Sequence, residues 1–405
     1  MKEKYVAEFT SSEVKFEENK LLSFQKRSTL TTSYRVHQDD KVGIHCQVGE
    51  ISEEEGFAIA EENLKERPRP YPFELETGKR SRDKTEKQFT DRELLELAKE
   101  CMEYLCEKYP RFVFSANFVQ SKRTDTCIND KGMEYSNTDC AVNANITFKH
   151  VDSKDISDGG FGMGSRSFDK EVFCRMADNY LANYEVEVEL PEEIIIDMQY
   201  YSLVGILTAG LNGENLALGT SLLAGKVGEK VFSEEFSFTN DVSDEECWFD
   251  PFWDGDGCVT EEDKRTFVDK GVIVSGYADK RTAEKYHVLH TGNGSISFSD
   301  IPDPALANVR IVRSEKTVKE LLNGRLCVIP VSYCGGGFAD NGDYTMPIQC
   351  AMLSDGEKIL GKLPPFTMVS SMFEMFGKDF IGVGADNPIF NDKQILFRVR
   401  KNNIV

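Results

Sequence analysis

Several groups of ionisable side chains in this chain have types and spacings that could support metal or nucleophilic chemistry. Glu284, His287 and His290 follow one another at three-residue intervals, which on a helix would offer a metal three ligands from one side. The segment 288–293 is first apolar and then turn-like, which instead indicates a strand or a helix end. Positions three apart on a strand face opposite sides, so the simpler interpretation of these histidines is ordinary polar surface.

Two further patterns are less specific. Asp254-Gly255-Asp256-Gly257 is similar to part of a calcium-binding loop, but the EF-hand pattern would require an acidic residue where Phe252 stands, so we reject it. A cysteine and a histidine could form a nucleophilic pair, since the chain has 11 Cys and 5 His. No local signature selects such a pair, and buried, unreactive cysteines are the simpler interpretation.

Composition excludes several classes of function. The 405 residues carry a formal net charge of −21, which disfavours binding to the phosphate backbone of nucleic acid. No stretch approaches the roughly 20 apolar residues of a membrane span, and the polar start of the chain is unlike a signal peptide. We therefore expect a cytoplasmic globular protein with reduced cysteines, no nucleic-acid partner and no membrane partner.

The first half of the chain alternates strand and helix patterns. Residues 14–46 predict a β-meander with a turn at 38–41. Ser52 and Thr90 each begin a capping-box pattern, which predicts helices over about 53–65 and from 91 onward. Strands are expected near 112–120 and 140–148, a glycine-rich mobile loop at 159–164, and an amphipathic helix at about 168–183.

The second half is richer in short strands. Residues 187–191 look like a boundary, so we expect an N-terminal domain at 1–188 and a C-terminal β-rich domain at 189–405. A helix is expected over about 198–212, followed by many short β runs separated by Gly, Asp and Asn. Helices interspersed with meanders predict an α+β fold with two domains, an N-terminal antiparallel meander with helices and a mixed or antiparallel C-terminal β domain.

A series of sequence blocks in a fixed order resembles the TldD/PmbA family, which includes proteins once called modulators of DNA gyrase. The blocks are Ala209-Gly210-Leu211-Asn212-Gly213-Glu214, Gly219-Thr220-Ser221, Phe249-Asp250-Pro251-Phe252-Trp253-Asp254-Gly255-Asp256-Gly257, His290-Thr291-Gly292-Asn293-Gly294, Gly335-Gly336-Gly337 to Asp343-Tyr344, and Ser354-Asp355-Gly356-Glu357. The chain is more similar to the PmbA branch, also called TldE, than to TldD. The resemblance covers most of the chain and is strongest over 203–385.

The resemblance also identifies a zinc motif that this chain lacks. TldD-like members carry His-Glu-x-x-x-His on a helix, and the matching positions here are Val204, Gly205 and Ala209. Such members take a further ligand from a cysteine near the C-terminus, and no cysteine follows Cys350 here. Because both histidines, the general base and the thiolate are missing, we expect no metal, no cofactor and no catalytic residues at this site.

The function that the resemblance implies is that of a non-catalytic partner in proteolysis and peptide maturation. A PmbA-like chain would form a heterodimer with a TldD-like metallopeptidase paralogue and help to grip an unfolded peptide substrate. We expect Asn293 and the loop Gly335, Gly336 and Gly337 to border the cavity. Two alternatives stay open: a homodimeric, metal-free peptide-binding protein, and a peptidase with a relocated, non-zinc active site. Dimerisation is also expected from apolar residues near 366–376, which exceed what one small domain readily buries.

Overall fold

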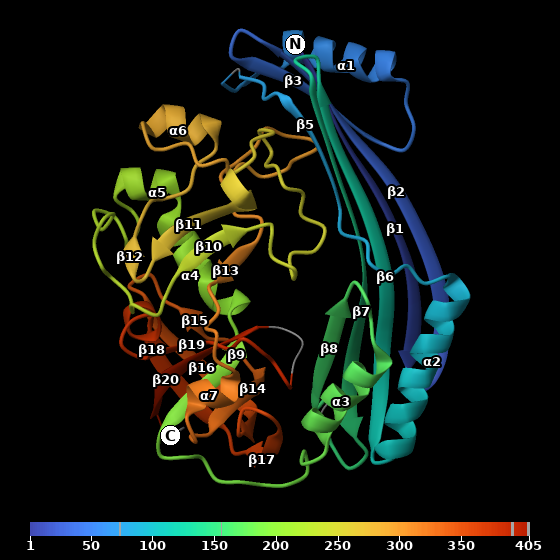
Figure 1. The fold of residues 1–405 in the computed structure, drawn as a ribbon, viewed down its shortest axis with the longest axis vertical. Coiled ribbons are helices and arrows are strands. Elements are labelled where there is room, and N and C mark those ends of the chain that lie inside the picture. The colour runs from blue at the N-terminus through green and yellow to red at the C-terminus, as the bar shows by residue number, and fades with distance from the viewer. Residues whose placement is uncertain (73, 155, 390–392, 403–405) are drawn as a thin grey trace.

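The computed structural model describes residues 1–72, 74–154, 156–389 and 393–402. It confirms the predicted α+β fold, in which long antiparallel strands stand beside a more compact, strand-rich second half (Figure 1). Among the described residues, no helix combines the length and the apolar character that crossing a membrane requires. The division into domains at 188/189 stays a prediction.

The first sheet is built from strong alternation of buried and exposed residues. Its strand order is β4-β3-β2-β1-β6-β7-β5, with β8 paired to β7. The strands are β1 (Lys2–Glu17), β2 (Lys20–Gln38), β3 (Lys41–Val48), β4 (Arg69–Pro70), β5 (Gly78–Asp83), β6 (Phe112–Asn129), β7 (Met133–His150) and β8 (Gly159–Ser165). The predicted meander is confirmed, and β6 and β7 both extend beyond the expected ranges.

Three helices accompany this sheet, α1 (Glu53–Glu66), α2 (Asp91–Lys108) and α3 (Lys170–Leu181). The hydroxyl of Ser52 accepts a hydrogen bond from the Glu55 N–H at the start of α1. Thr90 and Glu93 form a reciprocal capping box at the start of α2, as predicted. The apolar faces of α2 and α3 bury residues in one core with β6, β7 and β8.

The second half contains a small sheet and a large one. The small sheet has the order β12-β11-β10-β13 and comprises β10 (Phe238–Asp241), β11 (Lys264–Asp269), β12 (Val272–Ile273) and β13 (Val309–Ile311). The large sheet has the order β14-β9-β20-β18-β16-β15, and β14 also pairs with β16, so the sheet closes on itself. Its strands are β9 (Ile194–Gln199), β14 (Cys327–Tyr333), β15 (Gly337–Phe338), β16 (Asp343–Ser354), β17 (Ile359–Leu363), β18 (Phe366–Ser371), β19 (Phe380–Val383) and β20 (Gln394–Asn402).

The remaining helices are short, and α4 packs into the core of this half. They are α4 (Tyr201–Leu211), α5 (Gly213–Leu218), α6 (Lys280–Tyr286), α7 (Val318–Leu322) and α8 (Met372–Met375), with a 3-10 turn at Glu261–Asp263. Phe366, Met368, Met372 and Phe376 are buried in the same core as α4. The apolar surplus from which we expected dimerisation is therefore largely consumed inside the chain, because the large sheet curls around it.

The prediction of a loop at 159–164 is wrong. The glycine-rich segment expected as a mobile loop is strand β8, which pairs with β7 from Val142↔Ser165 to Phe148↔Gly159. Glycine has a low strand propensity, so the segment alone gives no strand signal. The segment forms a strand because its backbone hydrogen-bonds to β7, and this pairing cannot be predicted from its own side chains.

Candidate functional site

A cavity of about 470 Å³ lies between β7 and β8 of the first sheet and β9 and β14 of the large sheet. We call it the first cavity. Its polar lining includes Asn143, Asn145, Asp197, Gln199, Tyr333 and Gln394. Most of these side chains are uncharged hydrogen-bonding groups, so the cavity suits a neutral polar ligand better than a highly charged one.

Strand β8 contributes bare backbone to the first cavity. Gly160, Gly162 and Gly164 line it, and the alternate residues Phe161 and Met163, which also border it, belong to the hydrophobic core. A Cβ atom at Gly164 would lie 1.7 Å from the ring of Trp248, another lining residue, so the aromatic ring rests directly on the glycine. In the sheet order β8 pairs with β7 alone, which makes it an edge strand.

Two buried polar side chains in the lining each have one oxygen atom without a hydrogen-bond partner among the described residues. Asp197 is 4% exposed, and within the described part of the chain its Oδ1 has no hydrogen-bond partner. Burial, reinforced by the nearby Asp386 carboxylate, raises the pKa of Asp197 to about 7. Gln394 is 5% exposed, and its Oε1 is likewise without a partner among the described residues. Such groups are stabilised when a ligand or water hydrogen-bonds to them.

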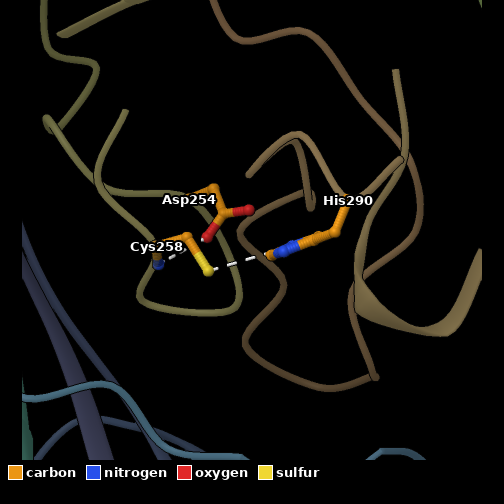
Figure 2. A group of neighbouring side chains, drawn as sticks. All are labelled: Asp254, Cys258 and His290. Carbon is orange, nitrogen blue, oxygen red and sulfur yellow. Dashed lines mark hydrogen bonds between the residues drawn. The ribbon is translucent and has the colours of Figure 1, made fainter. Parts of the chain in front are cut away.

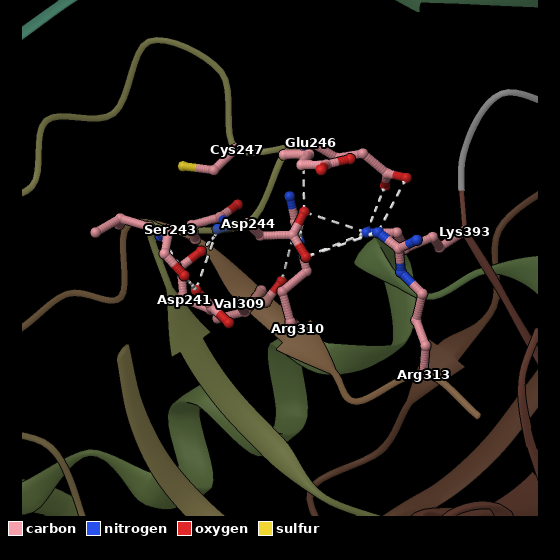
Figure 3. Close-up of polar contacts among 12 residues, drawn as sticks. Asp241, Ser243, Asp244, Glu246, Cys247, Val309, Arg310, Arg313 and Lys393 are labelled. Atoms are coloured by element: carbon pink, nitrogen blue, oxygen red, sulfur yellow. Dashed lines mark hydrogen bonds and ion pairs between the residues drawn. The ribbon is translucent and has the colours of Figure 1, made fainter. Parts of the chain in front are cut away.

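An ion cluster fixes the loop that carries Trp248 (Figure 3). The ammonium of Lys393, itself 5% exposed, lies 3.2 Å from both Asp244 oxygens and 2.9 Å from Glu246 Oε2. Arg310 lies 3.6 Å from Asp244 and donates to the hydroxyls of Tyr200 and Tyr201 at the start of α4. Burial raises the pKa of Glu246 to about 7 although Arg313 opposes the change. The loop and the start of α4 are therefore held together.

A second buried ion pair anchors the same loop to the first sheet. Arg166 donates to both Asp139 oxygens at 2.7 Å, and to the carbonyl oxygen of Cys247 at 2.7 Å. The backbone N–H of Phe249 donates to Asp139 as well, at 3.1 Å. Because Arg166 and Asp139 are 7% and 1% exposed, removal of either partner would leave a buried charge unpaired.

Helix α4 carries the three positions at which the zinc motif is degenerate. Val204 is 3% exposed and belongs to the hydrophobic core. Gly205 and Ala209 are exposed, and a Cβ atom at Gly205 would meet nothing within 4 Å. None of the three side chains has a donor atom for a metal, so the zinc that the family motif would hold does not fit on this helix.

A smaller cavity of about 280 Å³, here called the second cavity, lies among the loops near the small sheet. Asn293 lines it and is 2% exposed. Gly335, Gly336 and Gly337 all have positive φ and begin two residues after Tyr333, which lines the first cavity, but they line neither cavity themselves. A role of these four residues in peptide binding stays a prediction.

The second cavity borders a group of three possible metal ligands, Asp254, Cys258 and His290 (Figure 2). Cys258 Sγ lies 3.9 Å from His290 Nε2, and one ligand atom of each residue lies within 4.8 Å of the others. Backbone N–H groups of Asp256 and Cys258 donate to Asp254 Oδ1, and that of Gly294 donates to Oδ2 at 2.7 Å. These bonds fold the 254–258 loop against the segment that follows His290.

No sequence pattern indicates this group. The three-residue spacing joins His290 to Glu284 and His287, but His287 caps the end of α6 with φ 54° and the group of possible ligands does not include it. Asp254 belongs only to the rejected calcium-loop pattern. Cys258 and His290 are 32 positions apart in the sequence, a distance that gives no spacing signal, because loop packing brings the two together.

The cysteine in this group is poorly suited to be a nucleophile. Burial raises the pKa of the Cys258 thiol, and the Asp254 carboxylate raises it further. The thiol donates to Glu76 Oε1 at 3.3 Å, so a second acidic neighbour also opposes the thiolate. Burial lowers the pKa of His290, which leaves its imidazole neutral and able to act as a ligand.

One comparison with known proteins identifies the family of this chain. A family model for the PmbA/TldA metallopeptidase C-terminal domain matches residues 193–396. An uncharacterized protein of Methanocaldococcus jannaschii is 23% identical over 210 residues, which cover 50% of this chain and 47% of that protein. The chain thus spans about half the length of this curated relative.

Solved structures share the fold over nearly the whole chain. TldE from Thermococcus kodakarensis has a TM-score of 0.81 at 19% identity, covering 99% of this chain and 96% of that one. A putative modulator of DNA gyrase from Thermotoga maritima has a TM-score of 0.75 at 18% identity, with coverages of 99% and 96%. A third, from Bacteroides thetaiotaomicron, has a TM-score of 0.72 at 14% identity, covering 100% and 94%. The chain therefore belongs to the PmbA/TldD family, whose proteins are peptidase-like.

Proposed function

We propose that this chain binds an extended, unfolded peptide in the first cavity and acts in peptide maturation as the non-catalytic partner of a TldD-like zinc metallopeptidase. The observation that carries the proposal is the edge strand β8, whose glycine face lines a cavity otherwise rich in carboxamide side chains. Family membership supports a role in proteolysis.

The lining matches what an extended peptide backbone needs. A peptide offers alternating N–H and C=O groups, and an edge strand can pair with them while pockets take the side chains. Asn143 and Asn145 project from β7 beside the bare glycines, and Gln394 adds an acceptor from the opposite wall. The cavity volume of about 470 Å³ lies within the roughly 300–1,000 Å³ of ligand sites, enough for a short peptide segment.

Bond cleavage is assigned to the partner. Val204, Gly205 and Ala209 supply neither metal ligands nor a general base, so α4 cannot activate a water molecule. The proposed partner would contribute the zinc, and this chain would present the peptide. The homodimeric alternative also has the peptide bind in the first cavity, but there the partner is a second copy of this chain.

The test measures peptide binding by the full chain. A fluorescently labelled, unstructured, uncharged peptide is expected to bind saturably, and Asn145→Leu is expected to weaken binding because a backbone hydrogen bond worth about 0.5–1.5 kcal/mol is lost. Asn117→Leu is the matched control, since Asn117 lies opposite Asn145 on β6 and outside the cavity lining. Equal affinities of the two variants would remove the first cavity from the proposal.

A second measurement addresses the partnership. The chain alone is expected not to hydrolyse the peptide, whereas mixing it with a TldD-like paralogue should increase the molecular mass and produce chelator-sensitive hydrolysis. Hydrolysis by the isolated chain at enzyme-like rates, insensitive to chelators, would favour the relocated peptidase instead.

A further inference from the structure

We propose that Asp254, Cys258 and His290 form a binding site for a divalent metal ion of the zinc class, separate from helix α4. The site departs from the absence of bound metal expected from the sequence, and it is independent of peptide binding. It rests on the convergence of three ligand types from loop segments far apart in the chain.

The ligand geometry is close to that of a tetrahedral site. Zinc lies about 2.3 Å from a thiolate sulfur and about 2.0–2.1 Å from an imidazole nitrogen, which places the two ligand atoms about 3.6 Å apart at a tetrahedral angle. Cys258 Sγ and His290 Nε2 are 3.9 Å apart, so a rotamer adjustment of a few tenths of an ångström would complete the site. Asp254 lies within reach of both, since the three ligand atoms fall within 4.8 Å of one another.

The carboxylate ligand is already oriented. Three backbone N–H groups, from Asp256, Cys258 and Gly294, hold Asp254 in place, and Oδ2 accepts only one of these bonds. A lone pair on Oδ2 therefore remains for a metal. Preformed ligands reduce the ordering that metal binding requires, and hydrogen bonds to a ligand are a usual feature of metal sites.

The surrounding charges also favour a cation. Besides Asp254, the loop carries buried Asp256, and Glu76 accepts from the Cys258 thiol. Lys280 provides one compensating positive charge, 3.0 Å from Glu76 Oε1. On binding, the metal–sulfur bond replaces the S–H bond, the thiol proton leaves to solvent, and Glu76 keeps its contact with Lys280. A thiolate with an imidazole selects zinc-class ions over calcium or magnesium.

The test begins with the full chain treated with chelator and dialysed into metal-free buffer. We expect Zn²⁺ to bind with a stoichiometry of one, and Co²⁺ loading to produce a thiolate-to-cobalt charge-transfer band. Replacing ligand-supporting groups already weakens metal sites about 10–100-fold, so Cys258→Ser and His290→Gln should each weaken binding by about 100-fold or more.

Two matched variants are expected to bind metal as the parent does. Cys334→Ser changes the exposed cysteine, and His287→Asn changes an exposed histidine three residues away with a residue that tolerates its left-handed backbone. If Cys258→Ser does not fold, the charge-transfer band of the cobalt-loaded parent chain still shows whether a cysteine sulfur binds the metal. Lack of saturable binding, absence of the thiolate band, or full affinity in His290→Gln would overturn the proposal, whatever the peptide-binding result.

Discussion

Replacing Asp197 by Asn should remove a pH-dependent loss of stability that burial of this carboxyl imposes. Its pKa is raised from 3.8 to about 7, because burial and the Asp386 carboxylate disfavour the ionised form. In the unfolded chain the same group ionises near its ordinary value. The folded state therefore binds an extra proton between the two values, and stability falls as pH rises through this window.

The size of the effect follows from the same two pKa values. Their difference of about three corresponds to about 4 kcal/mol, since each pKa unit is equivalent to about 1.36 kcal/mol. The stability that the protonated Asp197 carboxyl preserves is fully present below pH 3.8 and is lost progressively toward pH 7. Above pH 7 the carboxyl is ionised in both states, and the free energy of unfolding changes no further on its account. Asn cannot ionise, so Asp197→Asn should be more stable than the parent at pH 8 by up to about 4 kcal/mol.

Thermal and urea unfolding at a series of pH values between 4 and 8 measure this effect. The parent and Asp197→Asn should have similar stability at pH 4 and diverge as pH rises. Asp340→Asn is the matched control, because Asp340 is exposed beyond β15, and its profile should follow the parent. If Asp197→Asn lost stability with pH as steeply as the parent does, another group would be responsible and the reasoning would be refuted.

Three further predictions concern packing around the first cavity and α4. Gly205→Ala should stabilise the chain by about 0.5–1 kcal/mol, because the position is helical and open; denaturant unfolding checks it, and destabilisation would contradict the helix. Gly164→Ala should destabilise by about 1–3 kcal/mol and change the tryptophan fluorescence, because the new methyl displaces Trp248; an unchanged spectrum would contradict that contact. Arg166→Met should lower the free energy of unfolding by about 3–5 kcal/mol by leaving Asp139 unpaired, and a loss below about 1 kcal/mol in urea titration would show that water already screens the pair.

The sequence predicted those elements that depend on interactions between residues close together in the chain. Ser52 and Thr90 cap their helices because each side-chain oxygen accepts a hydrogen bond from the backbone N–H three residues later, which has no partner within the helix. The turn at 38–41 was equally predictable, since Asp39 and Asp40 tolerate the positive φ of a tight hairpin. The alternation of apolar and polar residues likewise predicted β7, because successive side chains of a strand point to opposite faces of the sheet.

Features that depend on distant pairing could not be predicted in this way. Strand β8 exists because β7 pairs with it, and its glycines give no pattern of their own. Cys258 and His290 meet because Asp254 bonds to Gly294 across two loops, a contact that no spacing reveals. The position of Asp197 in a cavity wall likewise depends on how the large sheet packs against the first.

The recessed position of β8 has a consequence for what can reach it. An open strand edge on a protein surface invites pairing with the sheets of other molecules, which leads to aggregation. Here β14 stands across from β8, and a Cβ atom at Gly159 would lie 3.0 Å from Val331. At this end the two strands are close enough that a sheet from another molecule cannot add to β8. Packing of β14 beside the Gly159 end of β8 thus protects part of an open strand edge from aggregation.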